Sequence, residues 1–71
     1  MKKTLGEKII KNINNYLAKE GIPVGELASF SGIKYNSLWN ILKRNKNIRI
    51  EDYTAICKAL NKPMDFFIPK E

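Results

Sequence analysis

The sequence predicts an all-α protein in which five helices pack as one compact domain covering residues 1–71. Apolar residues recur at spacings of three and four along most of the chain, which is the period of an amphipathic helix, and no stretch shows convincing strand alternation. Glycine and proline fall between these periodic stretches, where helices end and begin. A chain of 71 residues has room for only one core, since a domain of this size buries about 60% of its unfolded surface.

The first predicted helix runs from about Thr4 to Glu20 and ends at Gly21, a residue suited to a helix C-cap. Its apolar positions are Leu5, Ile9, Ile13, Tyr16 and Leu17. A short second helix has Pro23 at or near its first position and extends to about Ser31. Gly32 follows it and can adopt the left-handed conformation that a tight turn needs.

The third predicted helix spans about Tyr35 to Lys43 and buries Leu38 and Ile41 on one face. A loop at 44–49 separates it from a fourth helix, which ends at Asn61. The apolar face of the fourth helix consists of Tyr53, Ile56, Cys57 and Leu60. Both helices are therefore amphipathic and are expected to pack on the same core.

Pro63 can open a fifth, short helix that reaches about Ile68. A helical wheel of this segment places Met64, Phe67 and Ile68 on the inner side and leaves Phe66 nearly opposite them. Phe66 is then either an exposed aromatic residue at the end of the domain or folded back on the first helix.

The composition favours a polyanionic partner and argues against an enzyme. The net charge is +6, from 13 Lys and Arg against 7 Asp and Glu. A single cysteine excludes an internal disulfide, and with no histidine the usual zinc ligands and the usual general base are missing. We find no nucleophile–base pair, phosphate-binding loop or metal set, so we expect no catalytic residues, no cofactor and no metal. Without a signal peptide or an apolar stretch of about 20 residues, we expect a cytoplasmic protein with no membrane contact.

The spacing across residues 24–41 is the most specific signal in the chain. It places a small residue, a turn glycine and two apolar anchors at fixed offsets, at Ala28, Gly32, Leu38 and Ile41. This pattern resembles the helix-turn-helix of the phage repressor and Cro (XRE-like) DNA-binding family, over about residues 5–68 and including the stretch IEDYTAICKALN. The resemblance implies a lambda-repressor-like fold in which the second and third helices form the helix-turn-helix.

By this resemblance, the outer face of the third helix reads the major groove of double-stranded DNA. The residues expected to contact bases are Tyr35, Asn36 and Asn40. Asparagine amides can form paired hydrogen bonds to adenine N6 and N7, and Tyr35 can touch a thymine methyl group or reach a phosphate. The alternative is that both asparagines are simply solvated on an exposed face.

Basic residues gather beside the proposed reading helix, where residues 34–49 contain five positive charges and no acid. These side chains can neutralise phosphates and fix the register of the protein on DNA. The residues expected to contact the DNA backbone are Lys34, Ser37, Trp39, Lys43, Arg44, Lys46 and Arg49. For Trp39, contact with a protein partner or cover for the rim of the core are alternatives to sugar-phosphate contact.

The sequence thus predicts a sequence-specific DNA-binding protein, a transcriptional regulator of the repressor type. Because one reading helix touches few base pairs, we expect a homodimer, with Phe66 and the C-terminal segment as a possible interface. The family's usual phosphate-contacting glutamine is replaced by Val24, and Pro23 and Lys34 stand where Ser or Thr usually cap the helices. The alternative function is therefore a helix-turn-helix fold used as a protein-interaction module or antitoxin-like partner.

Overall fold

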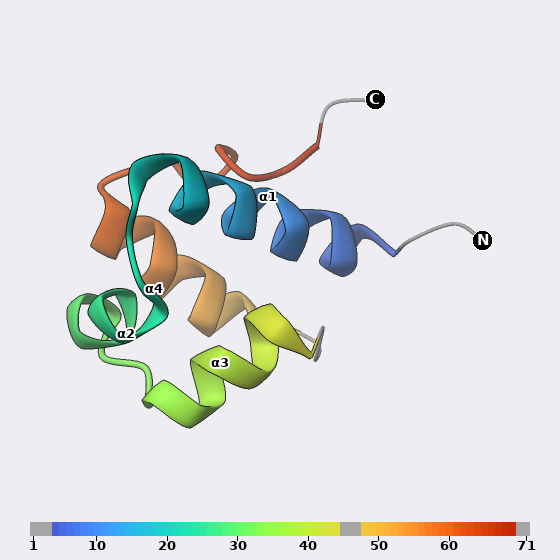
Figure 1. The fold of residues 1–71 in the computed structure, drawn as a ribbon. Helices are drawn as coiled ribbons and strands as arrows, with labels where there is room; N and C mark the ends of the chain where they lie inside the picture. Colours follow the sequence, from blue (N-terminus) through green and yellow to red (C-terminus); the bar gives the residue numbers. More distant parts are fainter. Residues whose placement is uncertain (1–3, 45–47, 70–71) are drawn as a thin grey trace.

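The computed structural model describes residues 4–44 and 48–69, and these residues contain four α-helices and no strand. The helices are α1 (Leu5–Glu20), α2 (Val24–Ser31), α3 (Tyr35–Lys43) and α4 (Ile50–Leu60) (Figure 1). Their bounds agree with the first four predicted helices to within about one residue where a bound was predicted. None of the described helices is both long and apolar enough to span a membrane.

α1 is closed at both ends by interactions that its sequence encodes. Thr4 is the N-cap, and its Oγ1 accepts a hydrogen bond from the Glu7 N–H at 3.2 Å while its own N–H donates to Glu7 Oε1 at 2.8 Å. This reciprocal pair is a capping box. At the other end Gly21 adopts φ 70°, and the next N–H, that of Ile22, donates to the Leu17 carbonyl at 2.9 Å. A left-handed glycine ends the helix here as the sequence predicts.

A tight turn at 32–34 connects α2 to α3. Gly32 has φ 77°, and its N–H donates to the Ala28 carbonyl at 3.0 Å. The Ser31 hydroxyl accepts a hydrogen bond from the Ile33 N–H at 3.3 Å, which holds the chain as it leaves the glycine. The turn therefore depends on a residue that tolerates positive φ and on a local side-chain acceptor.

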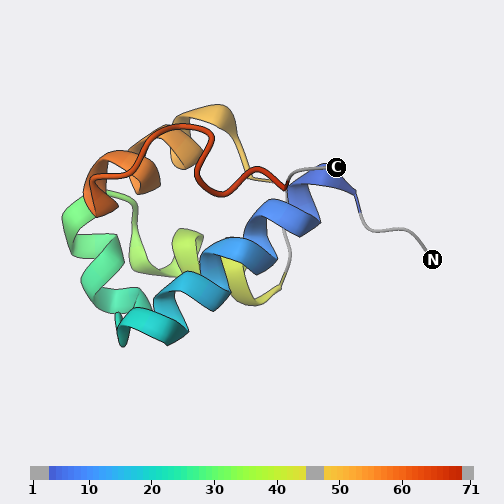
Figure 2. The ribbon, with the colours of Figure 1, turned by 90° about the horizontal axis from the view of Figure 1, so that it is seen from above.

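The helices enclose one core, to which all four contribute. α3 packs on both α1 and α2, and α2 packs on α4 (Figures 1 and 2). The buried residues are Ile10, Ile13, Leu17, Leu27, Ala28, Leu38, Ile41, Leu42, Tyr53, Ile56, Cys57 and Phe67. Burial raises the pKa of the Tyr53 hydroxyl to about 12 and also raises the pKa of the Cys57 thiol. Both groups are therefore neutral parts of the core near pH 7.

The prediction of a fifth helix is wrong, because residues 64–67 form turns and residues 61–69 contain no helix. The Phe66 N–H donates to the Pro63 carbonyl at 3.1 Å. Side chains of α1 and α4 donate hydrogen bonds to two other backbone carbonyls of this segment. Asn12 Nδ2 of α1 donates to the Phe67 carbonyl at 2.8 Å, and the Tyr53 hydroxyl of α4 donates to the Met64 carbonyl. A segment of six residues gains little from helix formation, so these tertiary bonds decide its conformation.

The same turns change which side chains face the core. Phe67 is buried as predicted, whereas Met64 and Ile68, predicted to face inward, are exposed. The helical wheel failed here because its 100° step applies only to a regular helix.

Candidate functional site

The exposed face of α3 carries the polar residues that the sequence singled out. Asn36, Asn40 and Lys43 are spaced by four and three residues, so they lie along one side of the helix. The opposite side is formed by Leu38, Ile41 and Leu42, which are all buried. Asn36 and Lys43 are exposed, and Asn40 is partly buried. α3 is thus anchored by its apolar face and presents two amides and an ammonium group outward.

A hydrogen bond from α1 fixes the C-terminal end of α3. Asn14 Nδ2 donates to the Leu42 carbonyl at 2.8 Å. That carbonyl lies in the last turn of α3, where carbonyls lack partners within the helix. Asn14 was not among the residues predicted from the sequence. A signal was present, since Asn14 directly follows the buried Ile13 on α1, and a polar residue beside the core needs a partner.

Tyr35 lies where the first turns of α2 and α3 approach each other. Its side chain is 52% exposed. A Cβ atom added to Gly25 would lie 3.8 Å from Cε1 of the Tyr35 ring, so one edge of the ring rests against the start of α2. A Cβ at this distance would make an ordinary van der Waals contact, so the ring lies beside the start of α2 without depending on a glycine there.

Trp39 and Arg44 form a pair at the other end of α3. The guanidinium carbon of Arg44 lies 5.7 Å from the centroid of the Trp39 ring, within the range of a cation–π contact. Trp39 is partly exposed and is not among the buried core residues. The pair places a cation over an aromatic face, and it holds the first residue after α3 close to the helix.

Positive charge accompanies the α3 face, as expected from the sequence. Lys34, Lys43 and Arg44 are exposed, as is Ser37. Arg49 is the N-cap residue of α4, and its Nε lies 3.6 Å from Asp52 Oδ2, so its charge is partly neutralised. The remaining predicted backbone contact, Lys46, falls outside the described residues.

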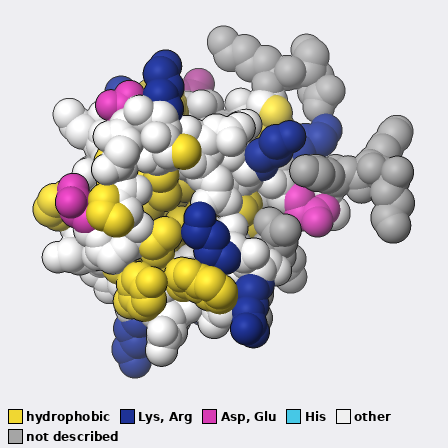
Figure 3. All heavy atoms as spheres, viewed as in Figure 1, with side chains coloured by type: hydrophobic (Ala, Val, Ile, Leu, Met, Phe, Trp, Pro, Cys, Tyr) yellow, Lys and Arg dark blue, Asp and Glu magenta, His cyan; other side chains and the backbone are white. Residues whose placement is uncertain are grey.

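Figure 3 shows how these side-chain types are distributed on one face of the molecule. Over the lower part of the view, where α3 lies in Figure 1, hydrophobic and basic side chains are neighbours. The acidic side chains visible in this view lie elsewhere. A surface on which basic and hydrophobic side chains are neighbours suits an anionic partner better than it suits a cation.

The first turns of α2 and α3 have no side-chain cap. Their N-caps are Pro23 and Lys34, and neither makes a capping hydrogen bond through its side chain. The first N–H groups of a helix have no acceptor within the helix and carry a partial positive charge. The start of α3, whose first turn contains no acidic residue, therefore adds to the positive potential beside Tyr35, whereas Glu26 in the first turn of α2 offsets that of the α2 start.

Phe66, the residue predicted to lie in a dimer interface, is partly covered by its own chain. Its ring is 45% exposed and lies edge-on to Tyr16 of α1, with the centroids 5.5 Å apart. Lys62 Nζ lies 5.0 Å from the centroid of the Phe66 ring. The arrangement matches the alternative in which Phe66 folds back on the first helix.

Comparison of the chain with protein-family models, with curated proteins and with solved structures finds no match. Within residues 4–44 and 48–69, no group of three or more His, Cys, Asp or Glu side chains could hold a metal ion. The functional assignment therefore depends on the α3 surface and its surroundings.

Proposed function

We propose that this protein binds double-stranded DNA sequence-specifically and acts as a transcriptional regulator of the repressor type. In this proposal α2, the turn at 32–34 and α3 form a helix-turn-helix, and α3 enters the major groove. The observation that carries the proposal is the division of α3 into two faces. One face anchors the helix through Leu38, and the other offers Asn36 and Asn40 together with basic neighbours.

Base recognition is assigned to the outward amides of α3. An asparagine amide both donates and accepts, which matches N6 and N7 at the major-groove edge of adenine, and a good pair contributes about 1–3 kcal/mol of discrimination. Asn40 is partly buried, so fewer rotamers compete with a binding geometry than at the exposed Asn36. In this proposal Tyr35, beside the start of α2, touches a thymine methyl group or a phosphate.

Phosphate binding is assigned to the charges around this face. Lys34 lies before α3, whereas Lys43 and Arg44 lie at its end, so cations flank the amides on both sides. Such contacts supply affinity and fix register without reading sequence. The uncapped start of α2 offers N–H groups for a further phosphate oxygen.

The experiment that tests this function has two arms. A binding site is first selected from a random duplex pool, and the affinities of variants are then measured on this site and on single-base changes of it. Asn36→Ala and Asn40→Ala are expected to lose discrimination at particular positions, by about 1–3 kcal/mol each. Lys43→Ala and Arg44→Ala are expected to weaken all duplexes about equally.

Lys19→Ala is the matched control for the charge variants, because Lys19 is an exposed lysine in the last turn of α1. Circular dichroism of each variant verifies that helix content is unchanged. The assignment is refuted if the asparagine variants weaken all duplexes equally while the basic variants change base preference. If the wild-type protein is not retained by random-sequence duplex at low salt, the protein-interaction function replaces DNA binding.

A further inference from the structure

Arg44 is the first residue after α3, and its backbone completes the last turn of that helix. Its N–H donates to the Asn40 carbonyl at 3.0 Å, and the residue is the C-cap. Arg44 is exposed. An exposed arginine side chain at a helix end samples many rotamers, and it loses this freedom when it binds a ligand. A contact that restrains the side chain beforehand therefore strengthens binding.

Trp39 provides such a contact. The guanidinium carbon of Arg44 lies 5.7 Å from the centroid of the Trp39 ring, and indole is the aromatic ring that attracts cations most strongly. Neighbours on a helix surface are three or four residues apart, so helical spacing alone would place Arg44 beside Asn40. Trp39 precedes Arg44 by five residues, which is about 140° around the helix axis. The arginine side chain therefore turns back to reach the indole, and helical spacing does not by itself produce the pair.

The indole is itself held in place by the protein. Trp39 is 36% exposed, so most of its surface is covered, and the neighbouring Leu38 is buried in the core. α3 is further fixed by the bond from Asn14 Nδ2 to the Leu42 carbonyl at 2.8 Å. The ring is thus a fixed support on a fixed helix, and the cation beside it has a defined position.

The charge of Arg44 is available to a ligand. Within residues 4–44 and 48–69, Arg44 forms no salt bridge, whereas the Nε of Arg49 lies 3.6 Å from Asp52 Oδ2. A guanidinium group stacks on an aromatic ring through its face, and the N–H groups along its edge can still donate to two oxygens of one phosphate. A ring and a phosphate therefore do not compete for the same side of the cation.

A phosphate at the end of α3 needs a fixed cation more than a phosphate at its start does. The last carbonyl groups of a helix carry partial negative charge, which repels a phosphate, whereas the first N–H groups attract one. At the C-terminal end of α3 the attraction must come from the side chains of Lys43 and Arg44. Of these two cations, Arg44 is the one that lies over an aromatic ring.

We propose that Trp39 is a positioning residue for DNA binding, which holds the Arg44 guanidinium where it binds one phosphate group of the duplex backbone at the end of α3. The edge of the guanidinium binds the phosphate, and the indole supports the cation from behind. The direct contact of Trp39 with the sugar-phosphate backbone, expected from the sequence, is then not required. The inference rests on the proposed function, because it names the ligand of one cation on the same surface.

The pair is tested first without DNA, because Trp39 is the only tryptophan in the chain. Its fluorescence therefore reports on this site alone when tryptophan is excited selectively. Arg44→Ala is expected to uncover the indole face and to increase quenching by acrylamide, a neutral quencher. Quenching equal to that of the wild-type protein would show that the pair does not form in solution, and this would overturn the proposal.

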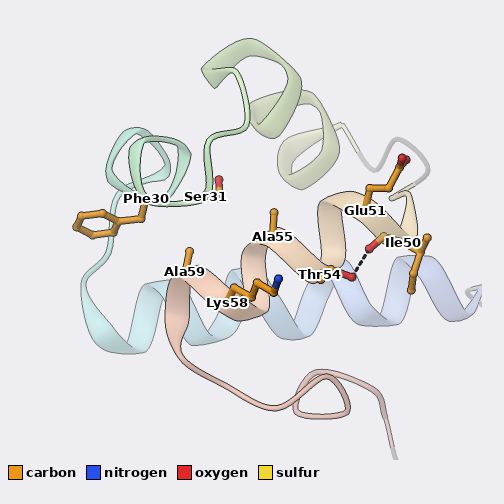
Figure 4. Close-up of a pocket in the computed structure, with 8 residues that line it drawn as sticks. All are labelled: Phe30, Ser31, Ile50, Glu51, Thr54, Ala55, Lys58 and Ala59. Carbon is orange, nitrogen blue, oxygen red and sulfur yellow. Dashed lines mark hydrogen bonds between the residues drawn. The ribbon is translucent and has the colours of Figure 1, made fainter.

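Lys58→Ala is the matched control for loss of a cation. Lys58 is an exposed residue of α4 and lines an open groove between α2 and α4, together with Phe30 and Ile50 (Figure 4). None of the residues that line this groove belongs to α3. The control variant is therefore expected to leave the quenching of Trp39 and the affinity for duplex nearly unchanged.

A double-mutant cycle on a selected duplex tests whether Trp39 acts through Arg44. Trp39→Leu is expected to weaken binding about two- to fivefold when Arg44 is present, the range of an exposed cation–π contact. In an Arg44→Ala background the same substitution is expected to change affinity little, because no cation remains to be positioned. Trp39→Phe, which keeps an aromatic face, is expected to lose less than Trp39→Leu. Circular dichroism verifies that each variant is folded.

Duplexes that carry a single uncharged methylphosphonate identify the phosphate that Arg44 binds. At one position of the selected site, this replacement is expected to weaken binding by the wild-type protein and to leave the affinity of Arg44→Ala unchanged. Trp39→Leu is expected to respond less than the wild-type protein at the same position. A Trp39→Leu variant that keeps the full response there would contradict a positioning role.

The outcomes separate this inference from the proposed function. Equal losses from Trp39→Leu in both backgrounds would show that Trp39 contacts DNA by itself, and no loss in either would show that it has no role in binding. Either result overturns the inference and leaves DNA binding intact. A protein that binds no duplex contradicts the proposed function, and the inference then fails with it even where quenching confirms the pair.

Discussion

Replacing Asn14 by alanine should destabilise the protein by removing the bond that holds α3 to α1. Asn14 Nδ2 donates to the Leu42 carbonyl at 2.8 Å in a partly buried position. After the substitution this carbonyl, in the last turn of α3, keeps no partner from α1. The neighbouring residue offers a matched control, because Asn15→Ala makes the same chemical change at an exposed position of the same helix.

The magnitude follows from comparing the two variants. A net hydrogen bond contributes about 1 kcal/mol, with a range of about 0.5–1.5 kcal/mol. Alanine also has a higher helix propensity than asparagine by about 0.6 kcal/mol, and this gain applies equally to both positions. Asn14→Ala should therefore be less stable than Asn15→Ala by about 1 kcal/mol, which corresponds to a difference of about 4–8 °C in Tm for a domain of this size.

Thermal and urea unfolding followed by circular dichroism measure this difference. The urea midpoint should fall without a change in the slope, since the surface exposed on unfolding is nearly the same in both variants. If Asn14→Ala and Asn15→Ala melt within about 1 °C of each other, the bond contributes nothing and the account of how α3 is positioned is wrong.

Three further predictions concern the core. Ala28→Leu should overpack the region where α2 meets its neighbours and lower the free energy of unfolding by about 1–3 kcal/mol, whereas Ser29→Leu, at an exposed position, should cost little. Because the folded-state pKa of Tyr53 is raised to about 12, its contribution to stability is complete below about pH 10 and is lost as the pH rises towards 12. The loss is about 2–3 kcal/mol and should be absent in Tyr53→Phe, as pH-dependent urea titrations would detect. Cys57→Ala should lower stability by about 1 kcal/mol and leave duplex affinity unchanged, and a folded variant that fails to bind would assign a role to the thiol.

The four described helices could be predicted because local sequence determines where they begin and end. Gly21 and Gly32 adopt positive φ at the C-terminal ends of α1 and α2, where the sequence predicted the helices to end. Asn61 adopts φ 57° at the end of α4. The apolar periods of α3 and α4 predicted Leu38 and Ile56 as buried residues. Such features depend on residues a few positions apart, which a helical wheel and the capping rules describe well.

The C-terminal segment and the support of α3 depend on contacts between distant parts of the chain. The bond from Asn12 to the Phe67 carbonyl joins residues 55 positions apart, and that from Asn14 to Leu42 joins residues 28 apart. No periodicity reveals such pairs. The groove between α2 and α4 was missed for the same reason, since Phe30 and Ile50 lie in different helices and only the folded chain places them around one surface.

The salt dependence of duplex binding tests the central claim, that the α3 surface binds DNA, most directly. Lys34, Lys43 and Arg44 should neutralise about three phosphates, and Lys46 and the ion-paired Arg49 could raise this number to five. The slope of log K against log salt should then lie between about −2.7 and −4.5 per protomer. In Lys43→Ala the slope should become shallower by about 0.9. Binding that does not respond to salt, or no binding to any duplex at low salt, would contradict the account.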